Sequence, residues 1–142
     1  MAKNLVVRVS VEIHSPVKRV WEALTKPETI RHYMFGTTVV SDWQEGHPIL
    51  WRGEGEGKPY EDKGVILICQ PEKKLAYTHF SSRSGLPDVP ENRHTITIEL
   101  STEGDRTKVV LTQDHNASEK EQKESEANWK NVLNGLRKLL EY

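Results

Sequence analysis

The final stretch of the chain has the strongest helical pattern. Its apolar residues recur at spacings of three and four, which places them on one helix face: Trp129, Val132, Leu133, Leu136, Leu139 and Leu140. Ser118 followed by Glu121 has the spacing of a capping box and predicts where this helix begins. Towards that start, the same face carries Gln122 and Ser125. We therefore predict a helix over residues 118–142 whose apolar half seals a core and whose polar half borders an opening to solvent.

The beginning of the chain alternates between apolar and polar residues. Over Leu5–Ile13 every second residue is apolar, a period that predicts a strand with one face in the core. Ser15 before Pro16 predicts the N-cap and first residue of a helix. Thr25 and Glu28 repeat the capping-box spacing and predict a second short helix directly after the first.

The middle of the chain carries only strand and turn signals. Six segments rich in β-branched and apolar residues are separated by turn residues: Thr37–Ser41, Pro48–Gly53, Gly64–Cys69, Leu75–Phe80, Thr95–Leu100 and Lys108–Gln113. The connection Ser81–Asn92 is long for a hairpin, so we regard it as a candidate functional loop that Asn92 holds by a side-chain bond to the backbone. The order β-α-α-β6-α predicts an α+β fold in which a curved seven-stranded antiparallel sheet wraps around the C-terminal helix.

Composition sets bounds on the class of protein. A chain of 142 residues predicts a single domain over residues 1–142. The net charge of -1 comes from 20 basic and 21 acidic residues that are interspersed, which argues against nucleic acid and anionic membranes as partners. The single cysteine, Cys69, excludes an internal disulfide and a cysteine-rich zinc site. Arg8 within an alternating N-terminus argues against a signal peptide and membrane insertion, so we expect a cytoplasmic protein.

Short strings along nearly the whole chain carry a resemblance to a known family: Pro16–Thr25, Met34–Gly36, Ser41–Trp43, Gly46–Ile49, Gly64–Leu67, Leu75–His79, Pro90–Asn92, Asn128–Trp129 and Val132–Leu136. In order and spacing they resemble the SRPBCC superfamily of START-like, helix-grip proteins. More narrowly, they resemble its bacterial branch named after the activator of the heat-shock-protein-90 ATPase. The resemblance implies a hydrophobic cavity between sheet and long helix, with the two short helices at its mouth. Two positions depart from the family pattern. Lys26 stands where the family often has a capping aspartate, and His79 stands where a tryptophan is common.

Six histidines are spread along the sequence with spacings that match no zinc motif: His14, His32, His47, His79, His94 and His115. We interpret all but His79 as solvated or singly hydrogen-bonded, and we expect neither a metal nor a cofactor. Leu75, Tyr77 and His79 share one strand face, so Tyr77 and His79 would place two polar groups in the cavity. Local packing without any ligand is the alternative.

Aromatic residues complete the predicted site. Trp43, Trp51 and Trp129 would either stack against a planar ligand or fill the core, and Met34 with Phe35 would form an adaptable gate at the mouth. The predicted ligand-binding residues are Met34, Phe35, Trp43, Trp51, Tyr77, His79, Trp129 and Leu133.

The sequence gives less support to a serine-hydrolase site, a phosphate-binding loop or a pair of catalytic carboxylates. The chain has no Gly-x-Ser-x-Gly elbow, and the adjacent Asp114 and His115 should point apart in an extended segment. The glycine-rich stretch Gly53–Lys58 contains acidic residues that would repel phosphate, so we predict a flexible hairpin loop. We interpret the acidic residues of this region as a solvated face rather than a paired acid and base: Glu45, Glu54, Glu56, Glu61 and Asp62. We therefore name no catalytic residue.

The first functional hypothesis is a cytoplasmic protein that binds a small hydrophobic molecule, such as a lipid, a polyketide or another polycyclic compound. The first alternative is a cyclase or dehydratase that uses Tyr77 or His79 as acid or base. The second is a module that stimulates the ATPase of a heat-shock-protein-90 homologue. We expect a monomer or a weak dimer, and Gly135 inside the last helix indicates close contact with the sheet or with another subunit.

Overall fold

The computed structural model describes residues 5–55, 57–81, 85, 87–89, 92–116 and 118–141. Its helices and strands follow the predicted order: β1 (Leu5–Ile13), α1 (Val17–Thr25), α2 (Pro27–Tyr33), β2 (Thr38–Ser41), β3 (Pro48–Gly55), β4 (Lys58–Gln70), β5 (Lys74–His79), β6 (His94–Glu103), β7 (Arg106–Asn116) and α3 (Glu119–Leu140). Four residues named in the sequence analysis lie outside the described part of the chain: Glu56, Pro90, Glu91 and Tyr142.

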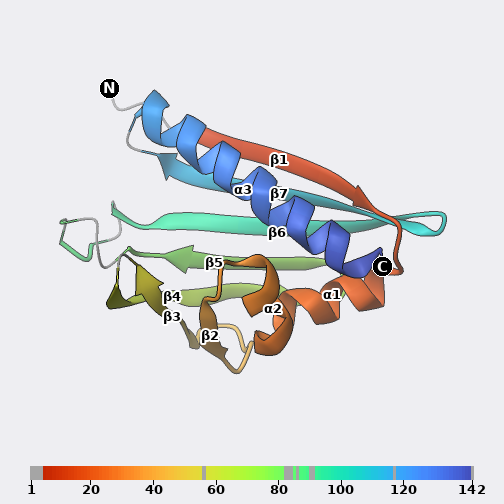
Figure 1. Ribbon diagram of the computed structural model, residues 1–142, viewed down its shortest axis with the longest axis horizontal. Helices are drawn as coiled ribbons and strands as arrows, with labels where there is room; N and C mark the ends of the chain where they lie inside the picture. Colours follow the sequence, from red (N-terminus) through yellow and green to blue (C-terminus); the bar gives the residue numbers. More distant parts are fainter. Residues whose placement is uncertain are drawn as a thin grey trace.

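The strands form a seven-stranded sheet in the order β1-β7-β6-β5-β4-β3-β2, and every neighbouring pair is antiparallel. The helix α3 crosses one face of this sheet diagonally, with α1 and α2 near its C-terminal end (Figure 1). This arrangement confirms the predicted helix-grip α+β fold. No described helix is both long and apolar enough to cross a membrane.

The predicted apolar face of α3 is the face that packs on the sheet. Its members from Trp129 to Leu136 are buried, as is Leu140, but Leu139 is 37% exposed and does not belong to it. The Ser118 hydroxyl accepts from the backbone N–H of Glu121 at 3.1 Å, which confirms the predicted start of α3.

The predicted caps of the two short helices are wrong. Pro16 is the N-cap of α1. Ser15 is instead drawn into the core, where its backbone carbonyl accepts from the Thr107 hydroxyl at 2.8 Å. The Thr25 hydroxyl donates back into its own helix, so Lys26 is the N-cap of α2 and makes no side-chain cap bond.

Two glycine-containing segments also differ from expectation. The strands β3 and β4 continue up to Gly55 and from Lys58, so the connection predicted as a loop over Gly53–Lys58 is a tight hairpin turn. Within the chain, the nearest neighbour of Gly135 is Tyr33 on α2. A Cβ at Gly135 would lie 3.2 Å from the Cβ of Tyr33, so this glycine allows α3 and α2 to pack closely.

Candidate functional site

A cavity of about 330 Å³ lies between the sheet and the middle of α3. Aromatic rings from three elements form part of its wall, Trp51 on β3, Tyr77 on β5 and Trp129 on α3. The polar half of α3 contributes Ser125 and Asn128, in agreement with the predicted opening on that side. The volume is near the lower end of the range for small-molecule sites in proteins.

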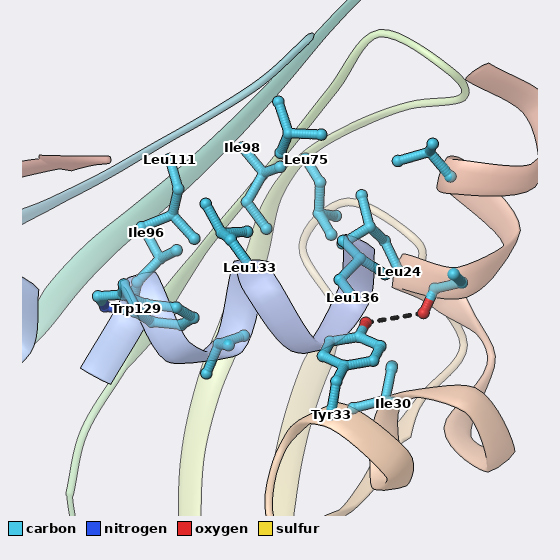
Figure 2. Close-up of a cluster of buried hydrophobic side chains, with 14 of the residues drawn as sticks. Leu24, Ile30, Tyr33, Leu75, Ile96, Ile98, Leu111, Trp129, Leu133 and Leu136 are labelled. Atoms are coloured by element: carbon cyan, nitrogen blue, oxygen red, sulfur yellow. Dashed lines mark hydrogen bonds between the residues drawn. The ribbon is translucent and has the colours of Figure 1, made fainter. Parts of the chain in front are cut away.

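The space beneath the C-terminal half of α3 is filled. Only about 30 Å³ remains there, roughly the volume of one water molecule, because side chains such as Leu24, Leu133 and Leu136 pack together (Figure 2). The Tyr33 hydroxyl donates to the Ala23 carbonyl at 2.7 Å, drawn as a dashed line in Figure 2. The helix grip therefore holds a packed core at one end and an open cavity at the other.

The structure divides the eight predicted site residues between these two regions. The larger cavity is lined by Met34, Phe35, Trp51, Tyr77, His79 and Trp129. Trp43 and Leu133 border only the filled region, where they contribute to the core. The role of the first group in ligand binding stays a prediction.

Tyr77 places a polar atom in an otherwise buried position. The residue is 6% exposed, and its ring centroid lies 5.3 Å from that of Trp51. Among the described residues, its hydroxyl has no hydrogen-bond partner, and it is not one of the fully buried polar atoms that lack one. Burial raises the pKa of Tyr77, so the hydroxyl keeps its proton at neutral pH and can donate it.

Asp62 is a site residue that the sequence analysis placed wrongly. Glu45, Glu54 and Glu61 are exposed as predicted, but Asp62 is only 8% exposed. Its carboxylate lies 3.1 Å from Nε2 of His79, and the His79 ring packs edge-on against Trp51. The cause is the length of β4, which begins at Lys58 and carries Asp62 inward.

Gln113, on β7, is a second site residue that the sequence analysis missed. It is 7% exposed and lines the cavity. Its Oε1 accepts from the indole Nε1–H of Trp129 at 2.6 Å. Its Nε2 donates to Oδ1 of Asn116 at 3.1 Å and to the Ser125 hydroxyl at 3.3 Å. This network connects the sheet to α3 and fixes the orientation of the Trp129 ring.

The histidines do not form a metal site in the described part of the chain, where no group of three or more His, Cys, Asp or Glu side chains could hold a metal ion. His79 and His94 face each other across β5 and β6, and both line the cavity. His94 has two partners, the Asp114 carbonyl at 2.8 Å and the Glu121 carboxylate at 3.3 Å. The prediction of a solvated or singly bonded imidazole is therefore wrong for His94.

The mouth of the cavity carries an exposed aromatic side chain. Phe35, two residues after the end of α2, lines the cavity and is 73% exposed. Its φ of 56° lies in the left-handed region, which is uncommon for a residue with a large side chain. In the long loop after β5, the Asn92 amide donates to the Pro87 carbonyl at 2.9 Å, as predicted.

The curved sheet, the long helix across it and the cavity between them define a helix-grip protein of the SRPBCC superfamily. Within it, residues 14–141 match the family described as Activator of Hsp90 ATPase homolog 1-like protein, and the chain belongs to that family. A search of curated proteins found no match.

Solved structures agree with this assignment. ChR145 from Cytophaga hutchinsonii is 53% identical over 99% of this chain and 97% of its own, with a TM-score of 0.88. The Aha1 dimer from Colwellia psychrerythraea is 17% identical over 96% of each chain, with a TM-score of 0.74. DynU16, from the dynemicin biosynthetic locus, is 18% identical over 98% of this chain and 48% of its own, with a TM-score of 0.81. The last two show a shared fold.

Proposed function

We propose that this protein is a cytoplasmic binding protein that holds a small molecule with a flat apolar part and polar groups in the cavity beside α3. The observation that carries the proposal is the Tyr77 hydroxyl, which borders about 330 Å³ of space and has no partner among the described residues. This hydroxyl can therefore donate a hydrogen bond to a molecule in the cavity. A bound molecule that offers an acceptor would use this donor.

The shape of the cavity supports a compact ring system over a long chain. The inner end beneath Leu133 and Leu136 is filled, so an extended acyl chain would have to displace the core. The rings of Trp51 and Trp129 border the open part, and large aromatic surfaces suit stacking against a planar ligand. A polycyclic or aromatic ligand therefore fits better than a fatty acid.

The test is an amide-shift titration of the isotope-labelled full chain with a fatty acid, a sterol, a hydroxylated polycyclic aromatic compound and an aromatic acid. We expect saturable shifts from the aromatic compound that cluster on Phe35, Tyr77, His79 and Trp129. Shifts that are absent for every compound, or that spread over the surface, would contradict the proposal. Because Trp43 borders only the filled region, an unchanged Trp43 amide is the internal control.

A second candidate function is acid–base catalysis of the cyclase or dehydratase type. It is favoured by the pair of Asp62 and His79, because a buried carboxylate bonded to an imidazole can orient that imidazole as a general base. Conversion of a bound compound would be followed by mass spectrometry with the wild type and His79→Asn. A variant that binds without converting would favour the enzyme, and no conversion by the wild type would leave the binding protein.

The family match supports a third candidate, an interaction with a heat-shock-protein-90 homologue. The measurement is the ATPase rate of such a chaperone with increasing amounts of this protein. A saturable increase would support a co-chaperone, whereas an unchanged rate together with ligand binding would exclude that activity for the tested chaperone.

A further inference from the structure

The strand register places a second buried polar group opposite Tyr77. Tyr77 pairs with Ile96 across β5 and β6, and Ile96 pairs with Gln113 across β6 and β7. Because neighbouring strands lie about 4.8 Å apart, the backbones of Tyr77 and Gln113 are about 10 Å apart. The three residues form one row that lines the cavity, with Ile96 as an apolar spacer between two polar groups.

The orientation of the Gln113 amide follows from the chemistry of its neighbours. An indole N–H can only donate, so the atom 2.6 Å from Nε1 of Trp129 must be the amide oxygen. The amide nitrogen therefore points towards Asn116 and Ser125. The Asn116 amide has a matching constraint, because its nitrogen donates to the main-chain carbonyl of Leu5 at 2.8 Å. Its oxygen is thus the atom that accepts from Gln113.

These hydrogen bonds determine which donors and acceptors of the cavity wall remain for a ligand. Gln113 donates its two N–H groups within the protein, so only the second lone pair of Oε1 is left to accept. The indole N–H of Trp129 is also used, and Trp129 presents only its apolar ring. The Ser125 hydroxyl accepts from Gln113, and its own hydrogen is not used in that bond.

A ligand hydroxyl fits this pair of groups. Its hydrogen can be donated to Oε1 of Gln113 while its oxygen accepts from the hydroxyl of Ser125. A methyl ether or a ketone can only accept, so it would leave the second lone pair of the Gln113 oxygen without a donor. A carboxylate would bring a negative charge against the amide oxygen, which is electrostatically unfavourable.

We infer that Gln113 is a specificity-determining residue that selects ligands with a hydroxyl group on their ring system. The inference rests on the proposed binding function and names the class of ligand, an uncharged hydroxylated ring compound. Gln113 acts by direct contact with the ligand hydroxyl, in addition to holding the Trp129 ring in place.

The test compares two probes with the same ring system, 2-naphthol and 2-methoxynaphthalene, in amide-shift titrations of the full chain. We expect 2-naphthol to bind about tenfold more tightly, the effect of one good hydrogen bond. In Gln113→Met, which keeps the length of the side chain, this preference should disappear because the affinity for 2-naphthol falls about tenfold more than the affinity for the ether, which loses only the support of the Trp129 ring. Gln113→Glu, which keeps an acceptor oxygen, should retain the preference.

A measurement on the wild type keeps the inference testable even where Gln113→Met does not fold. The Trp129 indole N–H donates to the same oxygen that would bind the hydroxyl. Its proton resonance should therefore shift at saturation with 2-naphthol by clearly more than with 2-methoxynaphthalene. Equal indole shifts would overturn the inference.

The outcomes separate this inference from the proposed function. Equal affinities of the wild type for the two probes, or an equal loss of both in Gln113→Met, would leave the binding function standing and show that Gln113 only holds Trp129. No saturable binding of either probe would count against the binding function itself, and the inference would fall with it.

Discussion

Two buried tyrosines allow a direct comparison of a structural hydroxyl and a ligand-binding one. The Tyr33 hydroxyl donates to the Ala23 carbonyl at 2.7 Å, whereas the Tyr77 hydroxyl has no partner among the described residues and borders the cavity. Both residues are 6% exposed. Substitution by phenylalanine removes one oxygen atom in each case, so the two variants are matched in volume and burial.

We expect opposite effects on stability and binding. Tyr33→Phe leaves a buried carbonyl without its donor, which should lower the free energy of unfolding by about 1–3 kcal/mol. For a chain of this size, that loss corresponds to a decrease in melting temperature of about 5 °C. Tyr77→Phe breaks no hydrogen bond to a described residue, so its free energy of unfolding should stay within about 0.5 kcal/mol of the wild type or rise.

Urea unfolding followed by tryptophan fluorescence measures the stability, and the titration described above measures the affinity. Tyr77→Phe should weaken binding of a compound that offers an acceptor by about threefold to tenfold. Tyr33→Phe should leave that affinity unchanged. If Tyr77→Phe lost as much stability as Tyr33→Phe, its hydroxyl would serve the fold and the argument for a ligand would be refuted.

Three further predictions concern stability. Gly64→Ala should cost about 3 kcal/mol or more in urea unfolding, because the new Cβ would lie 1.8 Å from the carbonyl oxygen of Thr78. Ser118→Ala removes the N-cap hydrogen bond of α3 and should lower the free energy of unfolding by about 1 kcal/mol in the same assay. An unchanged free energy of unfolding would show that α3 does not depend on this cap. The hydrogen bond from His14 holds the pKa of Asp105 below its ordinary value. The stabilising effect of the ionised Asp105 side chain is therefore present above about pH 4 and lost at lower pH. Between pH 7 and pH 3, Asp105→Asn should therefore lose less stability in urea unfolding than the wild type does.

The order of elements could be predicted because each one has a clear period. Leu5–Ile13 alternates with a period of two, and the apolar face of α3 repeats every three to four residues. The caps of α1 and α2 could not be predicted in the same way. Ser15 has the sequence context of an N-cap, but its long-range bond to Thr107 places it in the core, and a local pattern contains no information about that contact.

The aromatic residues of the cavity wall could be predicted from the sequence, and the polar residues could be predicted only in part. Gln113 continues the alternation of Val109 and Leu111, so its inward position could have been recognised from the period of the strand. The position of Asp62 opposite Trp51 depends on the tight turn between β3 and β4, which the glycine-rich composition did not reveal.

Backbone geometry explains another wrong prediction. Asp114 and His115 were expected to point apart, as neighbours do in an extended strand. His115 instead has a φ of 54°, and its Nδ1 lies 2.9 Å from the Asp114 carboxylate. Positive φ is uncommon for residues other than glycine, although histidine is among the enriched types, and the sequence contains no signal for it at this position.

The two halves of α3 explain why the cavity lies where it does. Beyond Trp129, the face towards the sheet carries leucines such as Leu133 and Leu136, which are long enough to fill the space. Before Trp129 the same face carries Ser125, whose short side chain leaves space, and Gln122, whose amide donates to the Val6 carbonyl at 2.9 Å. A leucine at position 125 would extend the packed core into the cavity. The small polar side chain there therefore keeps the cavity open at the cost of apolar burial that the helix could otherwise gain.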